Sequence, residues 1–133
     1  MCVPARPHSV ARDRLRVLVV DDSDYCRRIL QVMLKAWGME CVFAFNGEEG
    51  LAQASSLRPD LIITDLQMPV CDGFEFLANL SKLPADKQVP IIVLSGSLNE
   101  LDTDKHETLK RADCVLEKPV HPTKLLECVT NIF

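Results

Sequence analysis

The stretch "LRVLVVDDSDYCRRILQVML", residues 15–34, ends an apolar run with two adjacent carboxylates, Asp21 and Asp22. The run at residues 16–20 has the composition of a buried strand, and a helical pattern begins directly behind the acidic pair. Two unit charges about 4 Å apart repel by roughly 4 kcal/mol at an effective dielectric constant near 20. Either the two carboxylates are splayed and solvated, or a positive charge lies between them. The acidic pair could also be no more than part of a well-capped strand-to-helix turn.

The composition is that of one ordinary globular domain. The chain has 133 residues, of which 47% are hydrophobic and 26% are charged, so it can bury a sizeable core. Its formal net charge of −4 weighs against non-specific nucleic-acid binding, which needs a basic surface. Residues 1–14 contain two prolines and three arginines without apolar periodicity. We therefore expect a flexible tail at residues 1–14 and a single domain at residues 15–133.

The cysteines and the hydropathy together suggest a reducing, cytoplasmic location. No stretch is long enough to span a membrane, and no signal-peptide core precedes the first strand. Neither a C-x-x-C pair nor zinc-like spacing occurs, so we expect free thiols, with a disulfide framework as the less favoured alternative. The six cysteines are Cys2, Cys26, Cys41, Cys71, Cys114 and Cys128.

Apolar runs of strand type alternate with helical patterns along the whole domain. The expected strands are residues 16–20, 40–45, 60–66, 89–96 and 113–119. The expected helices are residues 26–37, a helix capped by Asn46, residues 74–83, residues 98–111 on weak signals, and a last helix beginning at Pro122. Strict alternation of this kind predicts an α/β fold, with a parallel five-stranded sheet covered by helices on both faces.

Polar residues stand where the apolar runs end. The first strand ends in Asp21 and Asp22, the third in Asp65, the fourth in Ser95, and the fifth in Lys118. Ligands bind at the carboxyl edge of open parallel sheets, so these side chains should converge there. Carboxylates with water suit Mg²⁺, and a carboxylate between such an ion and a lysine can act as a nucleophile toward phosphorus.

The motifs "VLVVDDSDYCRRIL", "PDLIITDLQMPVCDGFEFL", "PIIVLSG" and "VLEKPV" make the chain resemble a response-regulator receiver domain of two-component signalling. The resemblance covers about residues 15–133. It implies a doubly wound, flavodoxin-like (βα)₅ fold with strand order 2-1-3-4-5. It also implies phosphoryl transfer from a histidine kinase or histidine phosphotransfer protein, an unknown downstream protein partner, no direct contact with nucleic acid or membrane, and no turnover of a separate substrate.

The resemblance assigns the acidic residues to phosphoryl transfer and metal binding. It implies that Asp65 accepts the phosphoryl group as an aspartyl phosphate. Asp22 and Asp65 would bind Mg²⁺ directly, together with the backbone carbonyl of Gln67. Asp21 would act in the same acidic pair through a water molecule.

The resemblance also assigns the switch. Ser95 would contact the phosphoryl group and report its presence, Lys118 would pair with it, and the Lys118–Pro119 peptide bond would be cis. The family often has an aromatic switch residue where this chain has Val115. A β-branched side chain is stiff, so we expect Ser95 to drive a displacement of residues 96–111, with Val115 passive. That segment, with the fifth strand and fifth helix, would form the output surface.

Two other classes of protein remain open from the residues alone. An aspartate-nucleophile phosphatase of the haloacid-dehalogenase type also uses aspartate, Mg²⁺ and lysine, but its nucleophile follows the first strand, whereas Asp65 follows the third. A flavodoxin-like electron carrier needs a glycine- and hydroxyl-rich phosphate loop, for which "DDSDYC" has the wrong charge.

Overall fold

The structure, a computed structural model, describes residues 14–66, 68, 72–96 and 107–133. In this part of the chain, five parallel strands form one sheet in the order β2-β1-β3-β4-β5, as the resemblance implied. The strands are β1 (Arg16–Val20), β2 (Glu40–Ala44), β3 (Leu61–Asp65), β4 (Ile91–Ser95) and β5 (Cys114–Glu117). The helices are α1 (Asp24–Ala36), α2 (Gly47–Leu57), α3 (Gly73–Leu80), the short 3₁₀ helix η2 (Ala85–Lys87) and α5 (Pro122–Ile132).

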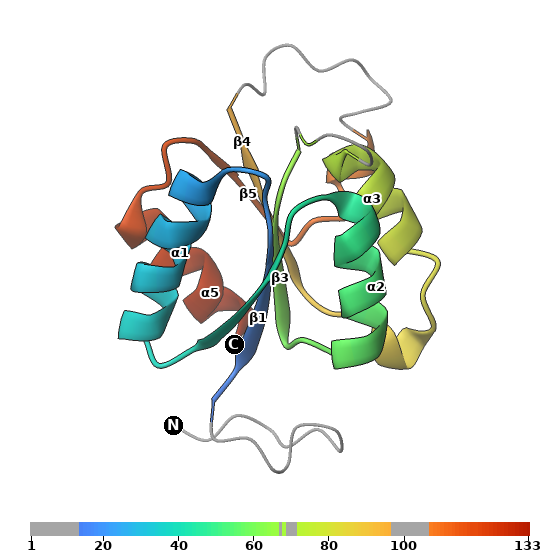
Figure 1. The fold of residues 1–133 in the computed structure, drawn as a ribbon, viewed down its shortest axis with the longest axis horizontal. Coiled ribbons are helices and arrows are strands. Elements are labelled where there is room, and N and C mark those ends of the chain that lie inside the picture. The colour runs from blue at the N-terminus through green and yellow to red at the C-terminus, as the bar shows by residue number, and fades with distance from the viewer. Residues whose placement is uncertain (1–13, 67, 69–71, 97–106) are drawn as a thin grey trace.

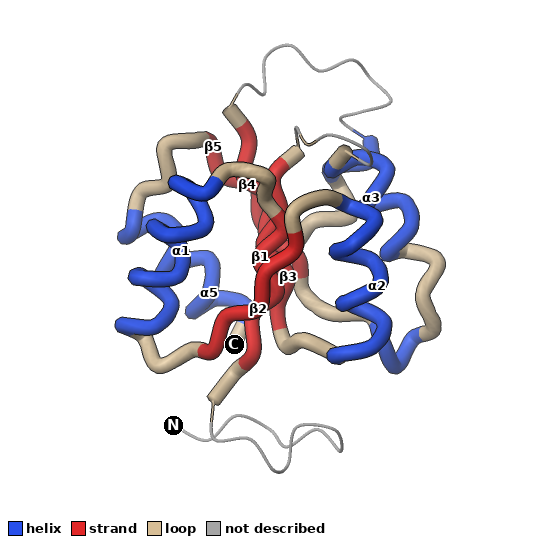
Figure 2. The backbone as a smooth tube through the Cα atoms, viewed as in Figure 1, coloured by secondary structure: helices blue, strands red, loops and turns tan. Residues whose placement is uncertain are grey.

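The sheet is the middle of three layers. Helices α1 and α5 cover one face, and α2 and α3 cover the other (Figure 1). The tube drawn in Figure 2 shows the strands edge-on between the two helical layers. No helix in the described ranges is both long and apolar enough to cross a membrane.

Two apolar cores lie on the two faces of the sheet, and successive residues of β1 alternate between them. Val17 and Val19 join the core that includes Leu30 of α1 and Leu125 of α5. Leu18 and Val20 belong to the other core, with Phe76 of α3 and other residues of α2 and α3. Strands buried on both faces read as continuous apolar runs, which is why they were recognisable in the sequence.

The helix starts follow from capping residues. Ser23 accepts a hydrogen bond from the Cys26 backbone N–H and begins α1, and Asn46 accepts from the Glu49 N–H and begins α2. Pro122 occupies the first turn of α5, as predicted. The caps thus fix where each helix leaves the carboxyl edge of the sheet.

Helix α3 differs from the predicted range 74–83. Asp72 caps it by accepting from the Glu75 N–H, so the helix begins at Gly73, and it ends at Leu80 in turns with i→i−3 hydrogen bonds. Of the helix predicted at 98–111, residues 107–109 are helical and residues 98–106 lie outside the described residues. The tail expected at 1–14 also lies outside them, except for its last residue.

The cysteines correct one expectation. Cys114 of β5 and Cys128 of α5 form a disulfide, with their Cα atoms 6.4 Å apart, so the expectation of free thiols is wrong for this pair. Packing of α5 on β5 brings the two residues together, which their apolar surroundings in the sequence do not reveal. Cys26 and Cys41 are free. Burial, followed by the negative charge of Glu40, raises the pKa of the Cys41 thiol to about 11, so this thiol stays protonated at neutral pH.

Helix α3 begins in contact with the end of β3. The Gly73 N–H donates to the Leu66 carbonyl oxygen at 2.8 Å. A Cβ atom at Gly73 would lie 2.4 Å from the Asp65 carbonyl oxygen and 2.5 Å from the Leu66 Cα. Because both neighbours are backbone atoms, neither can move without displacing Asp65.

We predict that Gly73→Ala lowers the free energy of unfolding by roughly 1–3 kcal/mol, because overpacking forces the β3 backbone away from α3. Urea denaturation checks the change. Gly96→Ala is the matched control, since no described atom lies within 4 Å of the added Cβ. Equal losses of stability in the two variants would contradict the close approach at Gly73.

Candidate functional site

Three carboxylates meet at the carboxyl edge of the sheet. Asp21 and Asp22 follow β1 directly, and Asp65 is the last residue of β3. The two strands are parallel neighbours, with Val20 opposite Thr64, so their ends coincide. One oxygen from each of the three carboxylates lies within 4.8 Å of the other two. The structure therefore brings together the three acids that the sequence pointed to.

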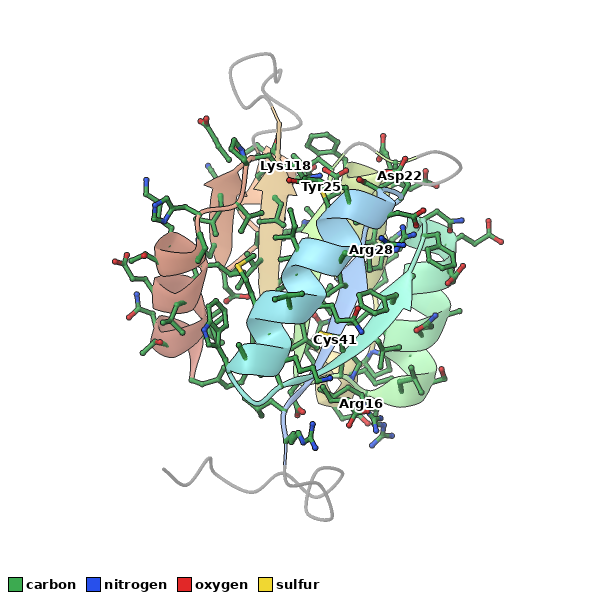
Figure 3. All side chains as sticks on the ribbon, turned by 60° about the vertical axis from the view of Figure 1, so that its left-hand side comes forward. Arg16, Asp22, Tyr25, Arg28, Cys41 and Lys118 are labelled. Atoms are coloured by element: carbon green, nitrogen blue, oxygen red, sulfur yellow. A yellow bond between two sulfur atoms is a disulfide. The ribbon has the colours of Figure 1, made fainter. Side chains whose placement is uncertain are left out.

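Lys118 provides the positive charge among these acids. Its Nζ donates to Asp21 Oδ2 at 3.1 Å and lies 3.4 Å from Asp65 Oδ2. The Lys118 backbone N–H donates to the Ser95 carbonyl oxygen at 2.7 Å, which ties the end of β5 to the end of β4. The Lys118–Pro119 peptide bond is cis, as the resemblance implied. Figure 3 shows Lys118 and Asp22 at the same end of the molecule, and Arg16 at the opposite end.

The two adjacent acids differ in environment. Asp21 is 1% exposed, and its second carboxylate oxygen, Oδ1, accepts from the Ser23 N–H at 2.9 Å. Asp22 is exposed, and its side chain has no hydrogen-bond or ion-pair partner within the described part of the chain. The repulsion posed by the pair is thus relieved in two ways: Asp21 is paired with a lysine, and Asp22 faces solvent.

The electrostatics keep Lys118 charged. Burial by itself lowers the pKa of the ammonium, but the negative charges of Asp21 and Asp65 and the hydrogen bond to Asp21 outweigh it, so the pKa is raised. Three carboxylates and one ammonium leave the cluster with a formal charge of −2. The arrangement can hold a cation and stabilise an anionic group beside Asp65.

Ser95 and Val115 occupy the two strands on the other side of β3. Asp65 is opposite Leu94, so Ser95, which is buried, comes one residue further along the neighbouring strand. Val115 lies opposite Val93, is half-buried, and packs against the core on the α2 and α3 face. Gln67, the remaining predicted metal ligand, lies outside the described residues.

The sequence matches the family described as "Response regulator receiver domain" over residues 17–130. The chain belongs to the response-regulator receiver family. This membership decides against the phosphatase and the electron carrier considered above. Receiver domains are phosphoacceptors of two-component signalling, and receiver domains bind Mg²⁺ in their acidic cleft.

Curated receiver proteins resemble the chain over very different shares of their own length. The chain is 32% identical over 117 residues to Protein PilG of Pseudomonas aeruginosa, and the match covers 88% of the chain and 86% of that protein. It is 42% identical over 94 residues to a gliding motility regulatory protein of Myxococcus xanthus, covering 69% of the chain but only 12% of that protein. The chain thus corresponds to nearly all of some receiver proteins and to a small part of others.

Solved receiver structures share the fold. The chemotaxis response regulator CheY4 of Vibrio cholerae is 34% identical, with a TM-score of 0.78 over 90% of the chain and 99% of that structure. The receiver domain of the sensor histidine kinase PA1611 of Pseudomonas aeruginosa is 24% identical, with a TM-score of 0.78 over 90% of the chain and 97% of that structure, and is described with a magnesium ion in its active-site cleft. At that identity, the second likeness concerns the fold.

Two contacts of the site were not expected from the sequence. Lys118 was expected to pair with a phosphoryl group, and the structure adds its hydrogen bond to Asp21. The Arg27 side chain donates to the carbonyl oxygen of Asp21 at 2.7 Å. Only the i,i+3 spacing of Asp24 and Arg27 could have pointed to an ordered arginine here, because side-chain to backbone contacts leave no pattern in a sequence.

We predict that Lys118→Met lowers the free energy of unfolding by roughly 1–3 kcal/mol at pH 7 without divalent ions, because the buried Asp21 carboxylate loses its cation. The expected loss is modest because Lys118 is partly exposed, so solvent screens part of the interaction. Because the pKa of Lys118 is raised in the folded protein, the stability that its charge contributes is fully present below the unfolded pKa of 10.5. That stability is lost as the pH rises through the folded pKa.

Urea denaturation at several pH values from neutral to strongly alkaline checks this prediction. Lys124→Met, at an exposed position of α5, is the control for removing one lysine charge. A stability difference between wild type and Lys118→Met that stays constant through the alkaline range would contradict the assignment.

Proposed function

We propose that Asp65 accepts a phosphoryl group from the histidine of a kinase or phosphotransfer protein, and that this modification switches a partner-binding surface. The observation that carries the proposal is the position of the Lys118 ammonium, 3.1 Å from Asp21 and 3.4 Å from Asp65. A cation held there neutralises charge on an incoming phosphoryl group next to the attacking carboxylate. Membership of the receiver family supports the same reaction.

The transfer step follows from these positions. An Asp65 carboxylate oxygen attacks phosphorus, and the P–N bond to the donor imidazole breaks as the new P–O bond forms. The imidazole nitrogen takes up a proton and leaves. Asp65 Oδ1 accepts from the Leu66 N–H at 2.8 Å, and Oδ2 faces the Lys118 ammonium at 3.4 Å. We propose Oδ2 as the attacking atom, because the ammonium beside it can neutralise charge on the incoming group. Lys118 then exchanges part of its contact with the carboxylates for a phosphoryl oxygen.

The donor set fits Mg²⁺, which prefers hard oxygen ligands and keeps several waters. We propose that Asp22, Asp65 and the backbone carbonyl of Gln67 hold the ion directly. Both oxygens of Asp21 already accept hydrogen bonds from protein groups, so this residue would act through water. When bound, the ion supplies a second positive charge to the phosphoryl oxygens.

The signal would leave the site through Ser95. Ser95 is buried one residue beyond the neighbour of Asp65, and its carbonyl oxygen accepts from the Lys118 N–H. Movement of Ser95 toward the phosphoryl group would therefore pull on the segment that follows β4 and on the start of the β5–α5 connection. Val115 has no ring to rotate and is stiff at χ1, so we propose that it stays passive. The partner surface would comprise residues 96–111, β5 and α5.

We predict that Asp65→Asn abolishes the mass increase of one phosphoryl group that a small phosphodonor such as acetyl phosphate produces in the wild type with Mg²⁺. The amide is not a nucleophile and carries no charge. Intact-protein mass spectrometry measures the change. Asp86→Asn, which removes an exposed carboxylate of η2, should leave labelling intact. Full labelling of Asp65→Asn would reject Asp65 as the acceptor.

We predict that Mg²⁺ raises the melting temperature of the wild type by several degrees at saturating concentration, because a ligand that binds only the folded state stabilises it. Asp22→Ala should remove most of that rise, although the metal-free variant should be at least as stable as wild type once one repelling charge is gone. Differential scanning calorimetry with and without Mg²⁺ measures both effects. Asp86→Ala, at an exposed carboxylate of η2, is the control for charge. An undiminished Mg²⁺ response in Asp22→Ala would place the ion elsewhere.

A further inference from the structure

The Arg27 side chain joins three parts of the fold beside the acidic pair. Its Nη1 donates to the Asp21 carbonyl oxygen at 2.7 Å, and its Nη2 pairs with Asp24 Oδ1. Its Cζ lies 4.4 Å from the centroid of the Phe45 ring, which follows β2. The Arg27 side chain is 14% exposed, whereas that of Asp24 is 81% exposed. An arginine on the first turns of a surface helix is therefore largely buried by its contacts.

The contact at Asp21 bears on its neighbour. The Asp21 carbonyl belongs to the peptide bond that connects Asp21 to Asp22, so the Arg27 hydrogen bond fixes the plane of that peptide. The Asp21 N–H is held as well, by the Ala44 carbonyl oxygen at 3.1 Å. The Asp22 carboxylate has no partner of its own in the described part of the chain, so its position depends on this backbone.

We infer that Arg27 is a positioning residue for the divalent-cation site and acts by holding the Asp21–Asp22 peptide so that the Asp22 carboxylate faces Asp65. The inference rests on the proposed metal site and adds a residue that does not touch the ion. Asp24 balances the charge of the guanidinium, and the Phe45 ring covers it, which strengthens a charge-assisted hydrogen bond by excluding water.

Charge and position predict opposite effects of removing Arg27. A positive charge near the site repels a cation, so deleting it should tighten Mg²⁺ binding if electrostatics alone mattered. If Arg27 positions Asp22, deleting it should weaken binding because the carboxylate loses its fixed direction. Arg28 is the matched control: it is the next residue on α1, it is exposed (Figure 3), and its removal changes the net charge equally.

The test is titration of the metal-free full chain with Mg²⁺ by isothermal calorimetry. We expect Arg27→Ala to raise the dissociation constant about tenfold, the effect of losing one charge-assisted hydrogen bond. Arg28→Ala should bind no more weakly than wild type. Arg27→Lys keeps the charge but lacks the planar fork, and it should still weaken binding about threefold or more. Phe45→Leu should weaken binding about twofold, because it uncovers the guanidinium.

The outcomes separate this inference from the proposal on which it depends. Binding that is unchanged or tighter in Arg27→Ala, with wild type binding normally, would overturn the positioning role and leave the metal site intact. Failure of the wild type to bind Mg²⁺ would overturn both. If Arg27→Ala does not fold, as judged by circular dichroism, Arg27→Lys and Phe45→Leu decide, and wild-type affinity in both would overturn the inference.

Discussion

The site depends on one ion pair network, in which the ammonium of Lys118 is bonded between a buried and a nearly buried carboxylate. Without it, Asp21 would be a 1% exposed negative charge with two like charges beside it, which would lower the stability of the fold at neutral pH. With it, the Asp21 carboxylate holds Lys118, and with Lys118 the start of the β5–α5 connection. The exposed Asp22 and the carboxylate of Asp65 lie beside this pair and are the groups proposed to bind the metal ion.

This network exists because the sheet is parallel and in register. The acids come from the ends of β1 and β3, the lysine follows β5, and the end of β4 is hydrogen-bonded to the lysine backbone. Residues almost a hundred positions apart, Asp21 and Lys118, therefore meet at one edge. The close approach of Gly73 to the Asp65 backbone places the start of α3 against the same edge, so α3 limits the movement of the Asp65 backbone.

The strands and the acidic edge were predictable because burial on both faces leaves continuous apolar runs, and because a carboxylate such as Asp65 stands out at the end of one. Other features depend on tertiary contacts that leave no local pattern. In the sequence, Cys114 and Cys128 were interpreted as two small apolar residues. Their disulfide depends on how α5 packs on β5. The early end of α3 follows from local i→i−3 turns after Leu80. The Arg27 contact to the Asp21 carbonyl depends on the bend after β1, which periodicity does not describe.

The net negative charge at the carboxyl edge of the sheet also bears on the order in which a cation and a phosphoryl donor bind. Three carboxylates and one ammonium give the cluster a formal charge of −2. A phosphoryl donor is itself anionic, so the bare edge repels it, while a small divalent cation is attracted and brings the local charge to zero. In the proposed reaction the cation should therefore bind before the donor, because the negative edge repels the donor until the ion is in place. Increasing ionic strength should weaken this preference for binding the cation first, because screening reduces both the attraction of the cation and the repulsion of the donor.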